Sequence, residues 1–237
     1  MALPKINEHL NFSMTIPSLG KQVKYRPYLV QEEKVLLQAF ESKDPATCLQ
    51  AMTDTLSATI DPREGIDVSK LATFDVEYMF TQVRAKSVGE NSTILITCKA
   101  CEEKNEYHID LDTLEIEVPV GQHIREVTDN IRVEMRYPSY SIMMQQEDFG
   151  EEDNFGKALD LVVNCMVAIH TGDERIDCSN ESKQDILDFV SSMTAAQLKN
   201  VTSFIEDMPA LKHTAEFMCQ KCTEKNELEL KGLTDFF

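Results

Sequence analysis

The spacing of apolar residues predicts helices in the first third of the chain. Apolar positions recur with helical periodicity in three stretches, residues 31–41, 45–59 and 75–88. Asp44 is a favourable N-cap for the second stretch, and Pro45 suits its first turn. Gly89 is a natural stop after the third stretch, because glycine adopts the left-handed conformation that ends many helices. We therefore expect a helical segment over residues 31–90.

The first 30 residues follow a different pattern. Phe12, Met14 and Ile16 alternate with polar residues, a turn-forming segment follows at 17–20, and the alternation resumes up to Tyr25. A period of two is typical of a strand with one buried face. The pattern predicts a β-hairpin arm over residues 1–30.

The second half of the chain mixes both periodicities. Residues 114–118 and 131–137 alternate and are predicted to be half-buried strands. Residues 155–170 are almost continuously apolar, which favours a buried helix ending at His170. Two further helices are predicted over 182–190 and from Thr194, where Thr194 and Gln197 form a capping box. We interpret residues 138–212 as a helical insertion.

Two short segments of the sequence repeat each other. Residues 98–106 read CKACEEKNE and residues 219–227 read CQKCTEKNE, so both carry a C-x-x-C pair and six of nine positions are identical. Each copy is preceded by an apolar stretch and followed by alternation, as in a small hairpin. We call these two segments the first and second knuckle.

The four knuckle cysteines predict one shared metal site. Zn²⁺ prefers four ligands in a tetrahedron at about 2.3 Å, and each knuckle offers two thiolates. The proposed ligands are Cys98, Cys101, Cys219 and Cys222. A site with all four positions filled by protein is structural, because no position is left for water or substrate. Thiolates also suit an iron–sulfur centre, so the choice between zinc and iron–sulfur stays open.

The distance between the knuckles along the chain determines the predicted architecture. The 117 residues between Cys101 and Cys219 far exceed the spacing within an ordinary zinc finger. Closing such a loop costs about 4 kcal/mol plus a constant, whereas structural zinc in finger peptides contributes about 10 to 16 kcal/mol. We predict an α+β fold that contains a split four-cysteine zinc ribbon with a small antiparallel sheet. The ribbon would comprise residues 91–137 together with 213–237 and would join distant parts of the chain around the helical insertion.

Composition and charge narrow the classes of function. The chain has 237 residues, of which 41 are acidic and 23 basic, and its net charge is −18. Neither knuckle has a basic surface, so binding to nucleic acid is disfavoured. No apolar run has the roughly 20 residues that span a bilayer, and the first ten residues lack a signal-peptide core. We expect a soluble protein that is not secreted by a standard route and whose partners are proteins.

The two ends of the chain carry the candidate partner-binding residues. Residues 1–30 have a net charge of +3 on an otherwise acidic chain, and the chain ends in two aromatic residues. The arm either docks on the protein itself or contacts a neighbouring subunit, and its apolar residues Phe12, Ile16 and Tyr25, which need cover, favour self-docking. The terminal aromatic pair either fills the protein's own core or anchors a partner, and both alternatives remain open. The candidates are Lys24, Arg26, Tyr28, Phe236 and Phe237.

The sequence contains no phosphate-binding glycine loop, no nucleophile elbow and no metalloprotease histidine pair. This favours a protein that is not an enzyme. One alternative is a thiol–disulfide oxidoreductase that uses a C-x-x-C pair, but such a cysteine is expected at a helix N-terminus and both pairs here lie between predicted strands. A zinc-ribbon nucleic-acid factor is a further alternative, weakened by the charge.

Several segments together resemble a known family. They are the opening Met1–Lys5, the arm motif Tyr25–Val30 with the Glu32–Lys34 that follows, the two knuckles, and the ending Gly232–Phe237. In this combination and order the chain resembles the T4-like bacteriophage baseplate family that includes a hub subunit and the hub assembly catalyst. The aromatic residue of the arm motif is often Phe in that family, whereas this chain has Tyr25 and Tyr28.

The resemblance implies a role in building the central hub of a contractile-tail baseplate. The partners would be other baseplate hub proteins, and the location would be the cytoplasm of the infected host cell. The resemblance leaves open whether the protein stays in the finished virion. A catalyst in this sense promotes assembly and implies no covalent chemistry.

Overall fold

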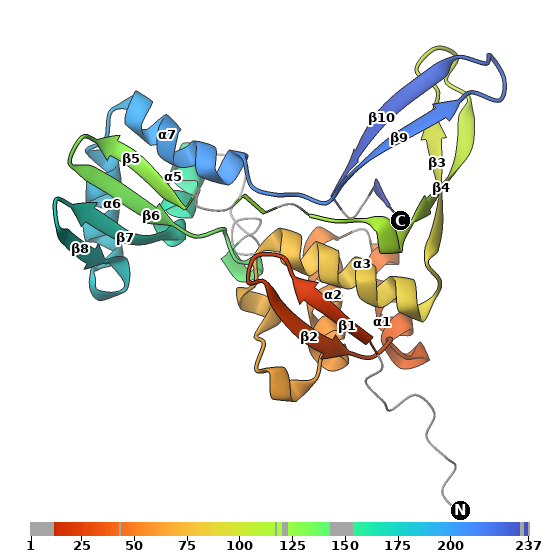
Figure 1. Ribbon diagram of the computed structural model, residues 1–237, viewed down its shortest axis with the longest axis horizontal. Coiled ribbons are helices and arrows are strands. Elements are labelled where there is room, and N and C mark those ends of the chain that lie inside the picture. Colours follow the sequence, from red (N-terminus) through yellow and green to blue (C-terminus); the bar gives the residue numbers. More distant parts are fainter. Residues whose placement is uncertain are drawn as a thin grey trace, which may run out of the picture. The chain divides into compact units, whose positions relative to one another are not determined.

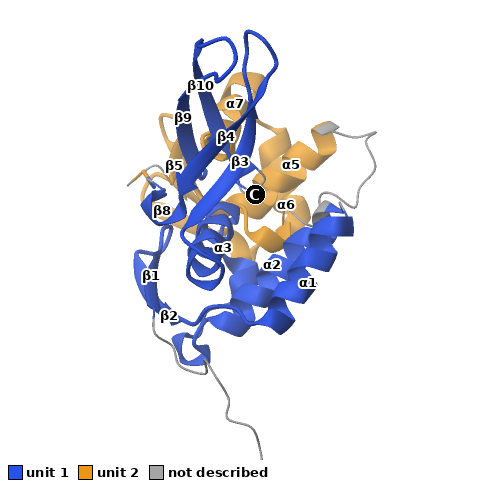
Figure 2. Cartoon of the chain, turned by 90° about the vertical axis from the view of Figure 1, so that its right-hand side faces the viewer, with its two compact units in different colours: residues 1–118, 210–237 blue, residues 119–209 orange. Residues whose placement is uncertain are grey.

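A computed structural model describes residues 12–42, 44–116, 118–119, 123–142, 154–232 and 235–236. The chain forms two compact units, coloured separately in Figure 2. Unit 1 spans residues 1–118 and 210–237, and unit 2 spans residues 119–209. Both parts of the chain that contain a knuckle therefore belong to unit 1, and unit 2 is inserted between them in the sequence.

The predicted hairpin forms at the start of unit 1 and packs on the unit's own helices. Strands β1 (Phe12–Ile16) and β2 (Lys21–Tyr25) pair antiparallel, and Gly20 in the turn has φ +60°. The alternating apolar side chains Met14, Ile16, Val23 and Tyr25 are all buried. The hairpin packs on the helices of unit 1 because this contact removes its apolar side chains from water.

The helices of unit 1 lie close to their predicted ranges. They are α1 (Val30–Ser42), α2 (Pro45–Thr59) and α3 (Thr73–Ser87). The side chain of Asp44 caps α2 and accepts a hydrogen bond from the backbone N–H of Thr47 at 2.9 Å. Short 3₁₀ helices complete this region: η1 (Pro62–Glu64), η2 (Val68–Lys70) and η3 (Leu111–Thr113).

Each knuckle is the tip of a two-stranded antiparallel hairpin. The first hairpin pairs β3 (Asn91–Thr97) with β4 (Lys104–Asp110), and the second pairs β9 (Lys212–Met218) with β10 (Lys225–Lys231). Figure 1 shows the two hairpins running alongside each other in unit 1, with their tips at the same end. Their inward faces share a core with α3 and η3, formed by Ala85, Ile96, Ile109, Leu111, Leu114, Leu211, Ala215, Leu230 and Phe236.

The aromatic residue before the last position contributes to this core. The Phe236 side chain is 0% exposed, and its backbone carbonyl accepts a hydrogen bond from the Ser92 hydroxyl at 2.8 Å. The structure thus favours self-docking for Phe236. Phe237, the other member of the terminal pair, lies outside the described residues.

Unit 2 combines one antiparallel sheet with helices. The antiparallel sheet has the order β5 (Ile124–Thr128), β6 (Ile131–Met135), β7 (Met166–Thr171), β8 (Glu174–Asp177). The helices are α5 (Asn154–Cys165), α6 (Lys183–Ser191) and α7 (Ala195–Glu206), with a 3₁₀ turn η4 (Cys178–Asn180) after β8. The predicted capping box of α7 is present: the Thr194 side chain accepts from the Gln197 N–H, and the Gln197 side chain accepts from the Thr194 N–H. None of the described helices of either unit meets the length and apolarity needed to cross a membrane.

The prediction of one helix over residues 155–170 is wrong for its last five residues, 166–170. Helix α5 ends at Cys165, and β7 begins at Met166 between strands β6 and β8. A continuously apolar run is typical of a buried helix and also of a central strand, so periodicity does not distinguish them. His170 therefore lies on a strand, where its Nε2 is 3.1 Å from a carboxylate oxygen of Glu134.

Two further strand predictions differ from the structure. Strand β6, within the predicted range 131–137, belongs to the sheet of unit 2 and does not extend the knuckle hairpins. The described residues of 114–118 form no strand, because Leu114 instead closes η3 with its side chain buried. The segment predicted as a helical insertion, 138–212, also contributes β7 and β8.

Candidate metal centre

The backbone of the first knuckle folds its two cysteines toward one point. The Cys98 N–H donates to the Glu103 carbonyl at 2.9 Å, and the Glu102 N–H donates to the Cys98 carbonyl at 3.0 Å. Glu102 has φ +59°, a left-handed conformation that side-chain-bearing residues rarely adopt. The second knuckle repeats the two bonds and the positive φ at the equivalent residues, Cys219, Thr223 and Glu224.

The two knuckle tips meet, as the sequence predicts. The sulfur of Cys98 lies 3.7 Å from that of Cys222, and the sulfur of Cys101 lies 3.6 Å from that of Cys219. All four sulfurs lie within 4.8 Å of one another. A tetrahedron with metal–sulfur bonds of about 2.3 Å has edges of about 3.8 Å. The separations therefore fit four ligands around one ion and exclude the S–S bond length of about 2.05 Å of a disulfide.

The pKa values of the cluster cysteines also indicate that a cation is needed to keep all four deprotonated. The backbone N–H of Cys222 lowers the pKa of Cys219 to about 6, against the effect of burial. The backbone N–H of Glu224 lowers the pKa of Cys222, but the nearby Cys101 sulfur and burial outweigh it and raise that pKa to about 12. Four thiolates this close repel one another, so a divalent ion is needed to hold all of them deprotonated.

Two buried asparagines bridge the knuckles, a role that sequence analysis missed. Asn105 and Asn226 are 3% and 4% exposed. The side-chain oxygen of Asn226 accepts a hydrogen bond from the Lys99 N–H at 2.9 Å, and that of Asn105 accepts one from the Gln220 N–H at 2.9 Å. The available signal was that both copies of the repeat carry Asn at the same position.

Side chains also join the two hairpins further from the cysteines. The hydroxyl of Tyr107 lies 3.1 Å from Nε2 of His213, and the ammonium of Lys221 lies 2.9 Å from a carboxylate oxygen of Glu103. The Lys99 ammonium donates to the Glu227 carbonyl at 2.6 Å. These contacts, together with the shared core, position the knuckles independently of a metal.

The candidate partner-binding residues are in different environments. The Lys24 side chain is exposed, and Tyr28 is half-buried. The Arg26 guanidinium donates to Glu32 Oε1 at 2.8 Å and to the Ala58 carbonyl at 3.0 Å, so its charge is paired within unit 1. Of these three residues, Lys24 presents a charge to solvent.

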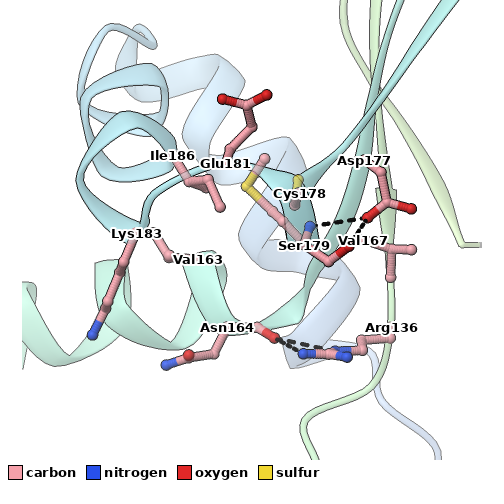
Figure 3. Close-up of a pocket in the computed structure, with 11 residues that line it drawn as sticks. Arg136, Val163, Asn164, Val167, Asp177, Cys178, Ser179, Glu181, Lys183 and Ile186 are labelled. Carbon is pink, nitrogen blue, oxygen red and sulfur yellow. Dashed lines mark hydrogen bonds between the residues drawn. The ribbon is translucent and has the colours of Figure 1, made fainter.

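Unit 2 contains a cavity of about 280 Å³ next to the sheet, drawn in Figure 3. Its lining mixes both signs of charge, with Arg136 and Lys183 against Asp177 and Glu181. The Arg136 guanidinium donates to the Asn164 carbonyl at 3.0 and 3.2 Å and is thus already bonded. The cavity shows no convergent set of groups for a particular ligand.

Comparison with known proteins gives one match. A family model described as T4 bacteriophage base plate protein matches residues 9–237. No curated protein and no solved structure matches the chain. The matched range includes both knuckles and all of unit 2.

Proposed function

Because the chain belongs to the T4 bacteriophage base plate protein family, we propose that it is a non-enzymatic factor in, or component of, the baseplate hub. The family match over nearly the whole chain is the observation that carries this proposal. The protein would act through contacts with other baseplate hub proteins, in the cytoplasm of the infected host cell during assembly.

The knuckle cluster serves a structural purpose in this proposal. Four sulfur ligands at tetrahedral separations leave no coordination position for water or substrate, which is the arrangement of a structural site. We assign Zn²⁺ to it, because the four sulfurs surround a single point at the spacing of one ion and an iron–sulfur cluster needs room for several atoms. The ligands would be Cys98, Cys101, Cys219 and Cys222.

The oxidoreductase alternative is weaker than the structural site. A redox C-x-x-C pair works when its low-pKa cysteine is partly exposed to the substrate. Cys98 and Cys219 both have a lowered pKa, but each is 1% exposed and its sulfur faces a cysteine of the other knuckle. The net charge of −18 likewise weighs against the nucleic-acid alternative.

Hub reconstitution tests the proposed function. The chain would be coexpressed with the hub proteins of the same phage, and hub complexes would be separated by size and identified by mass spectrometry. Omitting the chain should leave hub proteins unassembled. Mass spectrometry of purified virions then separates a retained component from a transient factor. Normal hub assembly in the absence of the chain would overturn the proposal.

A further inference from the structure

We propose that Asn105 and Asn226 are positioning residues of the metal centre, each donating a side-chain N–H to the first cysteine of the opposite knuckle. This inference rests on the proposed metal site and adds to it a pair of residues that tune its sulfurs. It assigns a role to the one buried polar position that the two knuckles share beyond the cysteines.

Asn226 makes two contacts that link the second knuckle to the first and one contact within its own knuckle. Its Nδ2 lies 3.4 Å from the sulfur of Cys98 and 3.0 Å from the Glu224 carbonyl, while its Oδ1 accepts from the Lys99 N–H. The amide is therefore held at both ends. Its orientation is determined by these partners, since only the nitrogen can donate to a carbonyl and only the oxygen can accept from an N–H.

Asn105 repeats the same arrangement in the other direction. Its Nδ2 lies 3.8 Å from the sulfur of Cys219 and 2.9 Å from the Glu103 carbonyl, and its Oδ1 accepts from the Gln220 N–H. The equivalence extends to every partner of both amides. The distance from Nδ2 to sulfur is longer for Asn105 than for Asn226, so we expect the contact of Asn226 with Cys98 to be the stronger of the two.

Charge explains why donors are needed at these sulfurs. Four thiolates around a divalent cation leave a net charge of −2, and Cys98 and Cys219 are the two most buried members of the cluster, each 1% exposed. Water is excluded from their sulfurs, so protein N–H groups must stabilise the charge. At Cys98 the Ala100 backbone N–H, 3.4 Å from the sulfur, is a second donor.

Substitution of Asn226 tests this role in the full-length chain loaded with Co²⁺ or Zn²⁺. Asn226→Asp keeps an acceptor for the Lys99 N–H but replaces the donor at the Cys98 sulfur with a negative oxygen. Asn226→Ala removes both. We expect each variant to bind Zn²⁺ about 10-fold or more weakly in competition with a chelator, as is typical when an outer-shell partner is removed. The matched control is Asn164→Ala, which removes a side-chain bond to the Asp160 carbonyl in unit 2.

A spectroscopic readout separates tuning of the sulfurs from a purely structural effect. An N–H donor stabilises the sulfur lone pairs, so losing it should move the sulfur-to-Co²⁺ charge-transfer band to lower energy. We expect this shift in both Asn226 variants and no shift in the control. Unchanged band energy and unchanged affinity in folded Asn226 variants would overturn the inference.

A measurement on the unmodified protein covers the case in which the variants do not fold. In protein loaded with ¹¹³Cd, magnetic coupling from the metal should reach the Asn226 side-chain amide protons through the sulfur. The Ala100 backbone amide serves as the internal reference. Coupling at Ala100 without coupling at Asn226 would overturn the inference, whereas a wild-type chain that binds no metal would instead overturn the proposed metal centre.

Discussion

The sulfur of Cys101 lies 3.6 Å from the sulfur of Cys219, although the two residues are 118 positions apart in the sequence. The companion pair, Cys98 and Cys222, is separated by 3.7 Å. Each cysteine thus has its close neighbour in the other knuckle. A metal at this point would tie together the two segments of unit 1 that flank the whole of unit 2 in the sequence.

Loss of the metal should destabilise unit 1. We expect about one zinc ion per chain in protein purified without chelator, and we expect Cys219→Ser to reduce the bound metal and lower the free energy of unfolding. The loss should be smaller than the about 10 to 16 kcal/mol that structural zinc contributes in finger peptides, because the shared core also holds the two hairpins together. Elemental analysis and thermal unfolding measure the two effects.

Cys48→Ser is the matched control for Cys219→Ser. The Cys48 thiol donates to the Ala39 carbonyl at 3.2 Å, a bond that a hydroxyl retains, and it lies outside the metal cluster. We expect this variant to keep full metal content. Wild-type protein with no metal, four readily alkylated knuckle cysteines and the same melting curve as Cys219→Ser would contradict the prediction.

The buried carboxylate of Asp75 should make stability depend on pH. Asp75 is 0% exposed and accepts hydrogen bonds from the backbone N–H and the hydroxyl of Ser18, at 2.8 and 2.5 Å. Burial raises the pKa of Asp75, and the hydrogen bonds from Ser18 and from the Ala72 N–H only partly offset this. The folded state therefore binds the Asp75 proton more tightly than the unfolded state.

A raised carboxyl pKa stabilises the folded state at low pH. Its contribution is fully present below the unfolded pKa of about 3.9 and is lost as pH rises through the folded pKa. The stability of wild type relative to Asp75→Asn should therefore fall as pH rises through this window, measured by urea unfolding at several pH values. The exposed Asp54→Asn serves as control. If the stability of wild type relative to Asp75→Asn rose with pH, the prediction would be contradicted.

The hairpin turn should depend on the hydroxyl of Ser18. Ser18→Ala removes the hydroxyl donor that lies 2.5 Å from the buried Asp75 carboxyl, while the backbone N–H donors of Ser18 and Ala72 remain. We expect a loss of about 1 to 3 kcal/mol, the usual contribution of a hydrogen bond to a carboxyl group. Denaturant unfolding measures it. A change below about 0.5 kcal/mol would indicate that water replaces the hydroxyl.

Lys24 and Arg26 should respond differently to substitution. Lys24 is exposed, so Lys24→Glu should weaken hub-partner binding and leave the monomer stable. The control is Lys34→Glu, at a lysine that is also exposed. Arg26 is paired with Glu32 and bonded to the Ala58 carbonyl, so Arg26→Ala should lower monomer stability by about 1 to 3 kcal/mol. Binding assays and thermal unfolding distinguish the two. Equal partner binding by Lys24→Glu and wild type would remove Lys24 from the interface.

Phe236 should behave as a core residue. Its ring is fully buried in unit 1, so Phe236→Ala should cost about 3 to 5 kcal/mol of unfolding free energy. Phe155→Ala, at a residue that is 67% exposed, is the control and should cost little. A residue that anchored only a partner would leave monomer stability unchanged on truncation, and that result would reopen the partner-binding alternative.

Features that depend on residues close together in the chain could be predicted from the sequence. The N-caps at Asp44 and Thr194 bond to groups three residues away, and the hairpin alternation of residues 12–25 reflects one buried face. The knuckle repeat identified the four cysteines, because the ligand types and their spacing are themselves sequence features. The family resemblance, which rested on the same segments, is confirmed by the family match.

Other features depended on contacts between distant residues, and only the tertiary structure decided them. Met166 begins a strand because β6 and β8 flank it, whereas the same apolar run would also suit a buried helix. The burial of Phe236 and the pairing of Arg26 with Glu32 follow from which surfaces meet. The sequence determined which sulfurs are available, and the packing of two hairpins determined that they lie within reach of one ion and that Asn105 and Asn226 lie against them.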